Sequence, residues 1–228
     1  MPVRITCQWR LGRLVWTKVS KVSRRPPANF IADSLGLDFL NSIATPLDTP
    51  VDWLDDGDGL AAWLAQAGLV PTDALEALRA RAAPGEMDGV AEQARGLREW
   101  FRSFVRKHLG RPLGPDVLRE LGPLNRLLEA DETFSRVTVE NGRRLELRRV
   151  RRWRSAESLL QPIAEAMARL VCEENFVDVK ACEGHNCTLI FVDRTRRRGR
   201  RWCSMAICGN RAKQAAHRNR LKNGSGAR

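Results

Sequence analysis

Four cysteines near the C-terminus have the spacing of a metal site. Cys182 and Cys187 form one C-x4-C pair, and Cys203 and Cys208 form a second pair after a spacer of fifteen residues. Two tight pairs at this separation can close a tetrahedral thiolate site around zinc. Such a closed site leaves no coordination position open for a water molecule. We therefore predict one structural Zn²⁺ ion held by these four residues, and no metal catalysis.

Two alternatives to this ligand set remain open from the sequence. His185 lies inside the first pair, and a site of three cysteines and His185 would leave one cysteine free. In a secreted protein the same cysteines could form two disulfides. However, the apolar stretch from Leu11 to Trp16 is interrupted by Gly12 and Arg13, which makes it too short and too charged for a signal peptide. We expect a cytoplasmic protein, in which thiols stay reduced and favour metal.

Arginines fill the second half of the spacer between the two pairs. Arg194 follows Asp193 directly, and we expect these two residues to pair internally and shape the loop. The other five are predicted to contact the phosphates of a nucleic acid: Arg196, Arg197, Arg198, Arg200 and Arg201. Phosphate contacts give affinity and register but do not select a base sequence. If all five engage, the log–log slope of affinity against salt should be roughly −4.5.

The alanine-rich segment after Cys208 predicts a helix that runs to about Leu221 and that Ser204 caps. Small side chains on one side should pack on the hairpin of the finger: Ala212, Ala215 and Ala216. Polar and basic positions are predicted to contact nucleic acid, since Arg and Gln can read guanine and adenine edges: Asn210, Arg211, Lys213, Gln214, His217, Arg218 and Arg220. A plain solvated helix is the alternative, because alanine, arginine and lysine favour helices in any role.

The elements that would hold the cysteines can be read from the same segment. Residues 176–179 look extended, and Gly184 and Asn186 permit tight turns between the first two cysteines. Residues 189–193 alternate as a strand, and residues 201–203 should form the return strand, where Trp202 covers a small core. A knuckle, a hairpin and a helix with the last ligand at its start make a treble-clef-like arrangement.

Charge separates the ends of the chain from its middle. The net charge is +12, with +7 in residues 1–29, −6 in residues 30–179 and +11 in residues 180–228. This asymmetry suggests a polyanion partner for the ends. We read residues 1–29 as a disordered basic tail and residues 223–228 as a flexible one. The chain has no run of eighteen apolar residues, so we expect no membrane span.

The middle of the chain is predicted to be mostly helical. Polar residues followed by apolar positions at helical spacing mark four helix starts, at Asp33, Asp58, Thr72 and Ser155. The first of these helices carries Leu37, Leu40 and Ile43, and the second stops at Gly68. The longest helix should span residues 87–109, with one apolar face: Leu97, Phe101, Phe104 and Val105.

Prolines and a hairpin signal organise the remainder of the middle. Pro115 and Pro123 bracket shorter helical pieces, Pro162 should kink the last body helix, and Cys172 is read as a buried packing thiol. Asn141-Gly142 between extended runs predicts a β-hairpin near residues 133–150. Its outer arginines favour a solvated face that pairs with the acidic body, with a second anion-binding surface as the alternative.

Two stretches resemble a known family arrangement. The string Cys208-Gly209-Asn210-Arg211, with 191–194 (Phe-Val-Asp-Arg), 201–205 (Arg-Trp-Cys-Ser-Met) and 212–213 (Ala-Lys) around it, resembles the CGNR zinc finger. Residues 33–42 (Asp-Ser-Leu-Gly-Leu-Asp-Phe-Leu-Asn-Ser) and the helical middle resemble the ABATE domain that accompanies it. The resemblance implies a stress-induced, DNA-binding transcription regulator.

These observations together predict a fold and a division of the chain. The fold class is mainly α with a small β-hairpin, that is α+β, with a helical body followed by a treble-clef-like zinc finger. The body should span residues 30–175 and the finger residues 176–222. We expect the finger to bind DNA, on the nucleoid within the cytoplasm, while the body dimerises or senses a small molecule.

Other function classes are weighed against this one. RNA binding shares the same phosphate chemistry, and an arginine loop could also dock on an acidic protein. An enzyme is disfavoured, because the body holds one histidine, His108, one cysteine, Cys172, and no glycine-rich phosphate loop or nucleophile motif. The acidic loop is read as solvated rather than as a cation site: Asp52, Asp55, Asp56 and Asp58.

Overall fold

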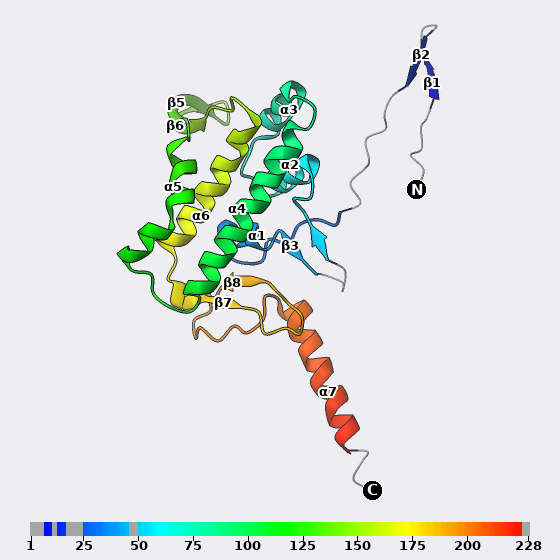
Figure 1. Cartoon of the computed structure of the whole chain (residues 1–228), viewed down its shortest axis with the longest axis vertical. Coiled ribbons are helices and arrows are strands. Elements are labelled where there is room, and N and C mark those ends of the chain that lie inside the picture. Colours follow the sequence, from blue (N-terminus) through cyan, green and yellow to red (C-terminus); the bar gives the residue numbers. More distant parts are fainter. Residues whose placement is uncertain (1–6, 11–12, 17–24, 46–49, 225–228) are drawn as a thin grey trace.

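The computed structural model describes residues 7–10, 13–16, 25–45 and 50–224. A helical body occupies one part of the molecule, two short strands join it to the cysteine-rich segment, and a terminal helix projects away (Figure 1). The predicted α+β class is therefore confirmed. The body helices are α1 (Leu35–Leu40), α2 (Gly57–Gln66), α3 (Thr72–Arg81), α4 (Glu86–His108), α5 (Gly122–Glu129) and α6 (Leu160–Glu173).

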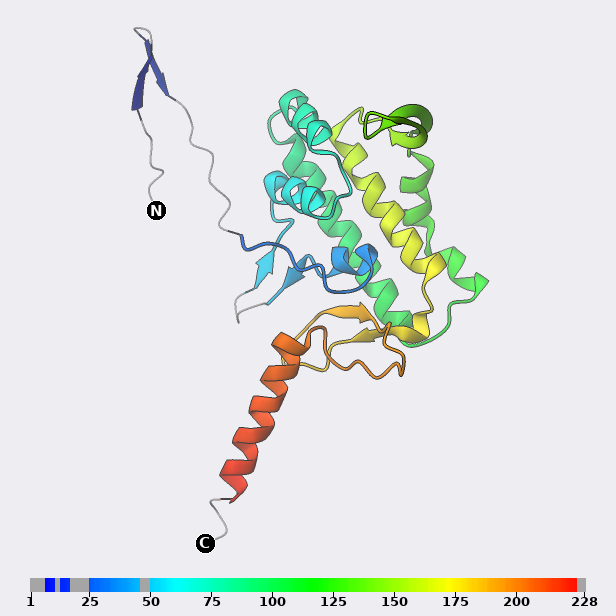
Figure 2. The ribbon, with the colours of Figure 1, turned by 180° about the vertical axis from the view of Figure 1, so that it is seen from behind.

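Helix α4 is the centre of the body. It begins after Gly85 and ends at His108, which confirms the predicted long helix, and its predicted apolar face is buried. Helix α2 packs on one side of α4, α1 contacts both α4 and α6, and α5 packs on α6 (Figure 2). Pro115 begins a 3-10 helix, η1 (Pro115–Glu120). Pro162, where we expected a kink, lies in the first turn of α6, where proline is tolerated, and the helix continues past it to Glu173.

Several helix starts differ from the sequence prediction. Asp56, not Asp58, caps α2, because its Oδ1 accepts from the Gly59 N–H at 2.7 Å. Thr72 is the first residue of α3 and Ser155 precedes a 3-10 helix, η2 (Ala156–Leu159), and neither side chain makes a capping hydrogen bond. Adjacent polar residues compete for one cap position, and the backbone geometry decides between them.

The first body helix also begins and ends differently. It starts at Leu35, and Asp33 before it has a positive φ of 60° and makes no cap. Ile43 is not helical: it opens strand β3 (Ile43–Ala44), which pairs with β4 (Val51–Asp52). The helix stops at Asn41, whose side chain is used elsewhere, as shown below.

Cys172 is exposed, which contradicts the prediction of a buried thiol. The buried face of α6 carries Ile163, Met167 and Leu170. At about 100° per residue, position 172 points roughly 200° away from Leu170, towards solvent. Its hydrophobic neighbour Val171 is only partly buried.

Arginines in the body hold the acidic loop in place. The Arg98 guanidinium donates two hydrogen bonds to the Asp52 carboxylate, at 2.8 and 2.7 Å. Burial alone would raise the pKa of Asp52, but the Arg98 hydrogen bonds and charge lower it below its usual value. Arg25 pairs with Asp55 and Asp56. The loop is thus neither a plain solvated loop nor a cluster aimed at a cation, since its carboxylates neutralise arginines.

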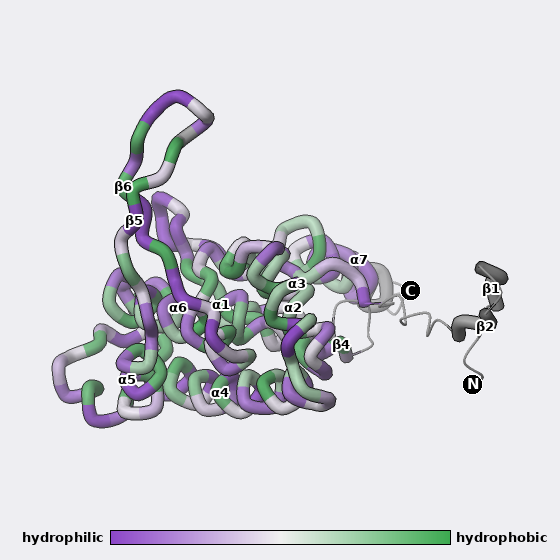
Figure 3. Tube along the Cα trace, turned by 90° about the horizontal axis from the view of Figure 1, so that it is seen from above, coloured by the Kyte–Doolittle hydropathy of each residue, from purple (hydrophilic) through white to green (hydrophobic). Residues whose placement is uncertain are grey.

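The predicted hairpin forms and stands clear of the body (Figure 3). Strand β5 (Thr133–Glu140) pairs antiparallel with β6 (Arg144–Arg151), and Asn141 and Gly142 in the turn both have positive φ. Within the described residues, its ion pairs with the acidic body lie at its base, where Arg151 contacts Asp131 at 2.6 Å and Glu165 at 2.9 Å. The predicted pairing of the hairpin's arginines with the body is therefore seen at one position of β6 in that part of the chain.

The N-terminal segment contains more structure than the predicted tail. Strand β1 (Cys7–Arg10) pairs with β2 (Arg13–Trp16). Residues 25–32 belong to the body surface, and the Trp53 indole N–H donates to the Pro26 carbonyl at 2.7 Å. Residues 1–6, 11–12 and 17–24 of the predicted tail lie outside the described residues, as do residues 225–228 of the second tail. Among the described residues, no helix combines the length and apolarity needed to cross a bilayer.

Candidate metal centre and nucleic-acid interface

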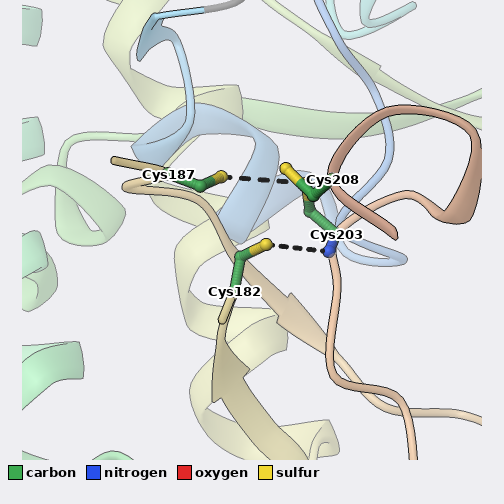
Figure 4. Close-up of side chains that lie close together, drawn as sticks. All are labelled: Cys182, Cys187, Cys203 and Cys208. Atoms are coloured by element: carbon green, nitrogen blue, oxygen red, sulfur yellow. Dashed lines mark hydrogen bonds between the residues drawn. The ribbon is translucent and has the colours of Figure 1, made fainter. Parts of the chain in front are cut away.

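The four cysteine sulfurs converge on one point between the two cysteine-bearing segments. In Figure 4 the side chains of Cys182 and Cys187 face those of Cys203 and Cys208. All four Sγ atoms lie within 4.8 Å of one another, with 3.8 Å between Cys187 and Cys203 and 3.6 Å between Cys203 and Cys208. Zinc–sulfur bonds of about 2.3 Å in a tetrahedron place the sulfurs about 3.8 Å apart. The site therefore fits one structural Zn²⁺ ion.

The surroundings of the sulfurs also fit a metal-bound thiolate set. The Cys182 Sγ accepts backbone N–H groups from Cys203 at 3.2 Å and from Gly184 at 3.4 Å. A Cβ atom at Gly184 would approach the Cys208 sulfur to 2.8 Å, so the knuckle requires glycine there. His185 is exposed and lies outside the cluster of ligand atoms. The cysteines are unbonded to one another, as the metal hypothesis requires.

Without a cation, the thiols of Cys187, Cys203 and Cys208 differ strongly in pKa. A hydrogen bond from Cys203 lowers the pKa of Cys187 to about 5. The same hydrogen bond and burial raise the pKa of Cys203, and burial raises the pKa of Cys208 to about 12. Four thiolates this close repel one another, and a dication is the group that lets all of them ionise.

The strand that follows the knuckle pairs differently from the prediction. Strand β7 (Val179–Ala181) pairs with β8 (Ile190–Val192), and residues 201–203 form no strand. Asp193 links the strand to the loop that follows it. Its carboxylate accepts hydrogen bonds from the Lys180 ammonium at 2.7 Å, the Thr195 hydroxyl at 2.6 Å and the Arg200 backbone N–H at 2.8 Å. Burial alone would raise the pKa of Asp193, but these donors hold it well below its usual range.

Arg194 and Arg200 connect the arginine loop to the body. Arg194 does not pair with Asp193 as predicted, because Asp193 faces inward; Arg194 pairs with Glu174 and donates to the Asp33 carbonyl. The Arg200 guanidinium lies 4.1 Å from the Phe191 ring centre and donates to the Ile31 carbonyl at 2.9 Å. It also pairs with the Asp33 carboxylate. Both side chains therefore fix the position of the loop.

The other loop arginines divide into engaged and outward-facing residues. Arg198 contacts Asp178 at 3.3 Å, and Arg201 contacts Glu183 at 2.6 Å while stacking on the Trp202 ring. Arg196 and Arg197 are exposed, and within the described ranges they have no hydrogen-bond or ion-pair partner. Among the described residues of the loop, Arg196 and Arg197 are thus exposed without an ion-pair partner, whereas Arg198 and Arg201 are exposed but held in ion pairs.

Helix α7 (Asn210–Gly224) projects from the metal centre away from the body (Figures 1 and 2). It follows a π-helical turn, η4 (Met205–Gly209), which contains Cys208. Ser204 precedes this turn, and its carbonyl accepts the Gly209 N–H, but its side chain makes no capping hydrogen bond, contrary to the prediction. Asn210 caps the turn from the other side, donating from its Nδ2 to the Ala206 carbonyl at 3.2 Å.

The alanine side of α7 does not pack on the strands, contrary to prediction. The main packing partner of α7 among the described elements is the preceding turn. Ala212 and Ala215 are half-buried and Ala216 is exposed. The basic and polar positions along the helix are all exposed: Arg211, Lys213, Gln214, His217, Arg218 and Arg220.

Family models cover both parts of this structure. Residues 33–174 match the ABATE model, described as "Putative stress-induced transcription regulator". The chain belongs to the ABATE family. Residues 179–221 match the CGNR zinc-finger model, so the two parts occur in the predicted order. Neither description is that of an enzyme family. Among curated proteins, none matches the chain.

The ABATE segment and the CGNR finger share one apolar core. Ile190, Phe191 and Val192 of the finger are buried in the same cluster as Leu37 and Leu40 of the ABATE segment. The Val192 N–H donates to the Ala32 carbonyl at 2.9 Å. The finger is therefore packed against the ABATE body as part of one structure.

Asn41 is a residue at this junction that the sequence prediction missed. Its side-chain amide donates to the Ile190 carbonyl at 2.8 Å and accepts from the Ile190 N–H at 3.1 Å. The side chain thereby satisfies the free edge of β8 inside a buried interface, where unpaired backbone groups are costly. A polar residue within the apolar run of α1 was the available signal, but its partner lies 149 positions away. The ion pairs of Asp33 with Arg200 and of Glu174 with Arg194 were also not predicted, and these partners lie 167 and 20 positions away.

Proposed function

We propose that this ABATE protein is a DNA-binding transcription regulator, in which the CGNR finger carries the DNA-contacting surface. The observation that supports this most strongly is helix α7, which stands clear of the body and presents basic and polar side chains. A helix of fifteen residues is about 22 Å long, and an α-helix fits the major groove of B-DNA. The side chains that would meet base edges share one face of it: Arg211, Gln214 and Arg218.

The arginine loop would contact phosphates beside the helix. Arg196 and Arg197 are the outward-facing cations of the loop, and Asp193 and Arg200 hold the loop in shape from inside. This division narrows the initial hypothesis of five phosphate contacts in the loop to two principal ones. Lys213, His217 and Arg220 on α7 extend the same basic surface. Zinc would act structurally: by binding Cys203 and Cys208 it would hold the arginine loop in a fixed position relative to the N-terminal end of α7.

The test is a selection from random DNA with zinc-loaded protein, followed by salt titration of the best sequence. The double variant Arg196→Gln/Arg197→Gln should lose affinity for every sequence and reduce the magnitude of the log–log salt slope by about 1.8. The matched control is Arg106→Gln/Arg119→Gln, which removes the same charge from exposed arginines of the body. The control should bind like the wild type.

Base recognition is tested on the helix. Gln214→Ala should relax the selected motif at one position while leaving the salt slope unchanged, because a base contact releases no counterion. If wild-type protein binds DNA without enriching a motif, and binds structured RNA more tightly, the proposal is wrong and an RNA-binding role takes its place. An absence of binding to either nucleic acid would turn attention to a protein partner for the loop.

A further inference from the structure

The four cysteines of the metal centre differ in their access to solvent. Cys182, Cys203 and Cys208 are buried, with exposed fractions of 8%, 3% and 6%. Cys187 is half-buried, and both of its neighbours along the chain are exposed. Cys187 is therefore the ligand residue that a reagent dissolved in water reaches most directly.

A small cavity lies beside these sulfurs. It has a volume of about 50 Å³, and three of the four cysteines line it, namely Cys187, Cys203 and Cys208. His185 and Ile207 also line it and are exposed, so the cavity opens to solvent. A water molecule needs about 10–15 Å³ of such space. The cavity therefore admits a molecule of a few non-hydrogen atoms and excludes bulky reagents.

The cavity favours chemistry on a negatively charged sulfur. The Arg211 guanidinium lines it, and no aspartate or glutamate is among the described residues of its wall. Reactive cysteines are found in electropositive, partly exposed surroundings of this kind. The thiolate is the form that attacks a peroxide, and a metal-bound cysteine is held as a thiolate. Among the sulfurs of the metal centre, that of Cys187 best combines these conditions with access.

Cys203 is placed to react with an oxidised Cys187. The two Sγ atoms are 3.8 Å apart, a contact that Figure 4 marks with a dashed line. A disulfide bond is about 2.0 Å long, so a shift of about 2 Å brings these atoms to bonding distance. Cys203 can therefore act as the resolving thiolate.

We propose that Cys187 is an oxidation site, at which hydrogen peroxide converts the finger to a zinc-free form with a Cys187–Cys203 disulfide. The Cys187 thiolate attacks one peroxide oxygen, the O–O bond breaks and hydroxide leaves, which gives a sulfenic acid. The Cys203 thiolate then attacks the Cys187 sulfur, the S–S bond forms and a second hydroxide leaves. Two thiolates are thereby oxidised and one peroxide is reduced to two hydroxide ions. Only two sulfurs remain as ligands, too few for a closed site, so the metal is released.

The modification would change the surface that the finger presents. Without a shared ion, Cys203 and Cys208 no longer hold the arginine loop to the N-terminal end of α7. Peroxide would thereby turn an ordered finger into a loosened one, and a reductant with zinc would restore it, since a disulfide is reversible. The chemistry requires bound zinc but no nucleic acid, so it is independent of DNA binding.

Peroxide treatment of the zinc-loaded, full-length chain tests this proposal. A chromogenic chelator measures released zinc, and peptide mass spectrometry after alkylation identifies the oxidised cysteines. We expect zinc release and the Cys187–Cys203 disulfide to appear at the same rate. The bulky tert-butyl hydroperoxide should release zinc about tenfold or more slowly than hydrogen peroxide, once corrected by the rates of both reagents at the exposed Cys172.

A variant at Cys187 separates oxidation from metal binding. Cys187→His keeps a zinc ligand and removes the thiol, so it should bind zinc and release it to hydrogen peroxide about tenfold or more slowly than the wild type. The matched control is Cys172→Ser, which removes an exposed thiol outside the finger and should release zinc at the wild-type rate.

The disulfide map of the wild type decides the matter even if Cys187→His fails to hold zinc. A first disulfide that lacks Cys187, such as one between Cys203 and Cys208, would overturn the proposal. So would zinc that stays bound while Cys172 becomes oxidised, or a corrected rate of zinc release that is equal for the two peroxides.

Discussion

Arg197 and Arg200 lie three positions apart in one loop and have different environments. Arg197 faces solvent, whereas Arg200 lies over the Phe191 ring and donates to the Ile31 carbonyl. The sequence shows two arginines in an arginine-rich run and gives no local signal that separates them. What separates them is the position of Asp193, whose carboxylate accepts the Arg200 N–H and turns that residue inward.

Asp38 is a second acidic residue whose side chain is buried and hydrogen-bonded. Its titration should change the free energy of unfolding with pH. Its side chain is 5% exposed and accepts the backbone N–H groups of Ile31 and Ala32, both at 3.0 Å. Burial raises the pKa of Asp38 to about 6, against the opposing effect of these hydrogen bonds. Between about pH 4 and pH 6 the folded chain therefore holds a proton here that the unfolded chain has lost.

We predict that Asp38 makes the free energy of unfolding fall as the pH rises through this window. The unfolded chain binds fewer protons there, so stability decreases with pH, by on the order of 2 kcal/mol in total. Asp38→Asn keeps an acceptor oxygen and cannot ionise, so it should lack this decrease. Urea titrations of both proteins at a series of pH values test this, and the zinc ligands titrate equally in both. Identical pH profiles would contradict the prediction.

The individual elements show which features local sequence can predict. The apolar period of α4 and the Asn-Gly turn of the hairpin are local signals, and both predictions are confirmed. The pairing partner of β8 was predicted wrongly: β8 pairs with residues 179–181 and not with residues 201–203. The hydrogen bonds of the Asp193 carboxylate with Lys180 and with the Arg200 backbone favour this pairing, and they cannot be read from local sequence. The predicted nucleic-acid contacts remain predictions. Contacts such as that of Asn41 with Ile190 join residues too distant in sequence for any local pattern to reveal.

Helix α7 is an element with little support from the rest of the molecule. Isolated helices of its length are marginal in water, because nucleation is costly and no packed face offsets it. We predict that backbone amides of α7 beyond its first turn exchange with solvent rapidly in the free protein, far faster than those of α4. Cognate DNA should slow them by about a hundredfold or more. Hydrogen-exchange mass spectrometry measures both helices together, and strong protection of α7 without DNA would contradict the prediction.

At the scale of the whole molecule, the metal centre and the helical body belong to one folding unit. The strands β7 and β8 pair beside the cysteines, and the buried side chains of β8 lie in the core that α1 and α4 also line. The arginines at positions 194 and 200 add ion pairs across the same junction. Loss of the metal should therefore also destabilise the body helices, which carry no metal ligand.

We predict that chelation of zinc destabilises the body together with the finger. Zinc binds the folded site, so at a free concentration of about 1,000 times its dissociation constant it contributes about 4 kcal/mol of stability. Removal should lower the urea midpoint measured by far-ultraviolet circular dichroism, a signal that the body helices dominate. The Arg106→Gln/Arg119→Gln protein should respond equally. If the chelator leaves the urea midpoint of the body helices unchanged, the prediction is wrong, and the body unfolds independently of the finger.

The buried junction at Asn41 bears on how such a chain can be inherited. A finger moved by recombination to another protein would carry β8 with its apolar side chains and one unsatisfied backbone edge, and the body left behind would keep a buried amide without a partner. Each half would need compensating mutations at once. Selection should therefore pass on the two halves together, and residues on the two sides of this junction should change in concert between descendants.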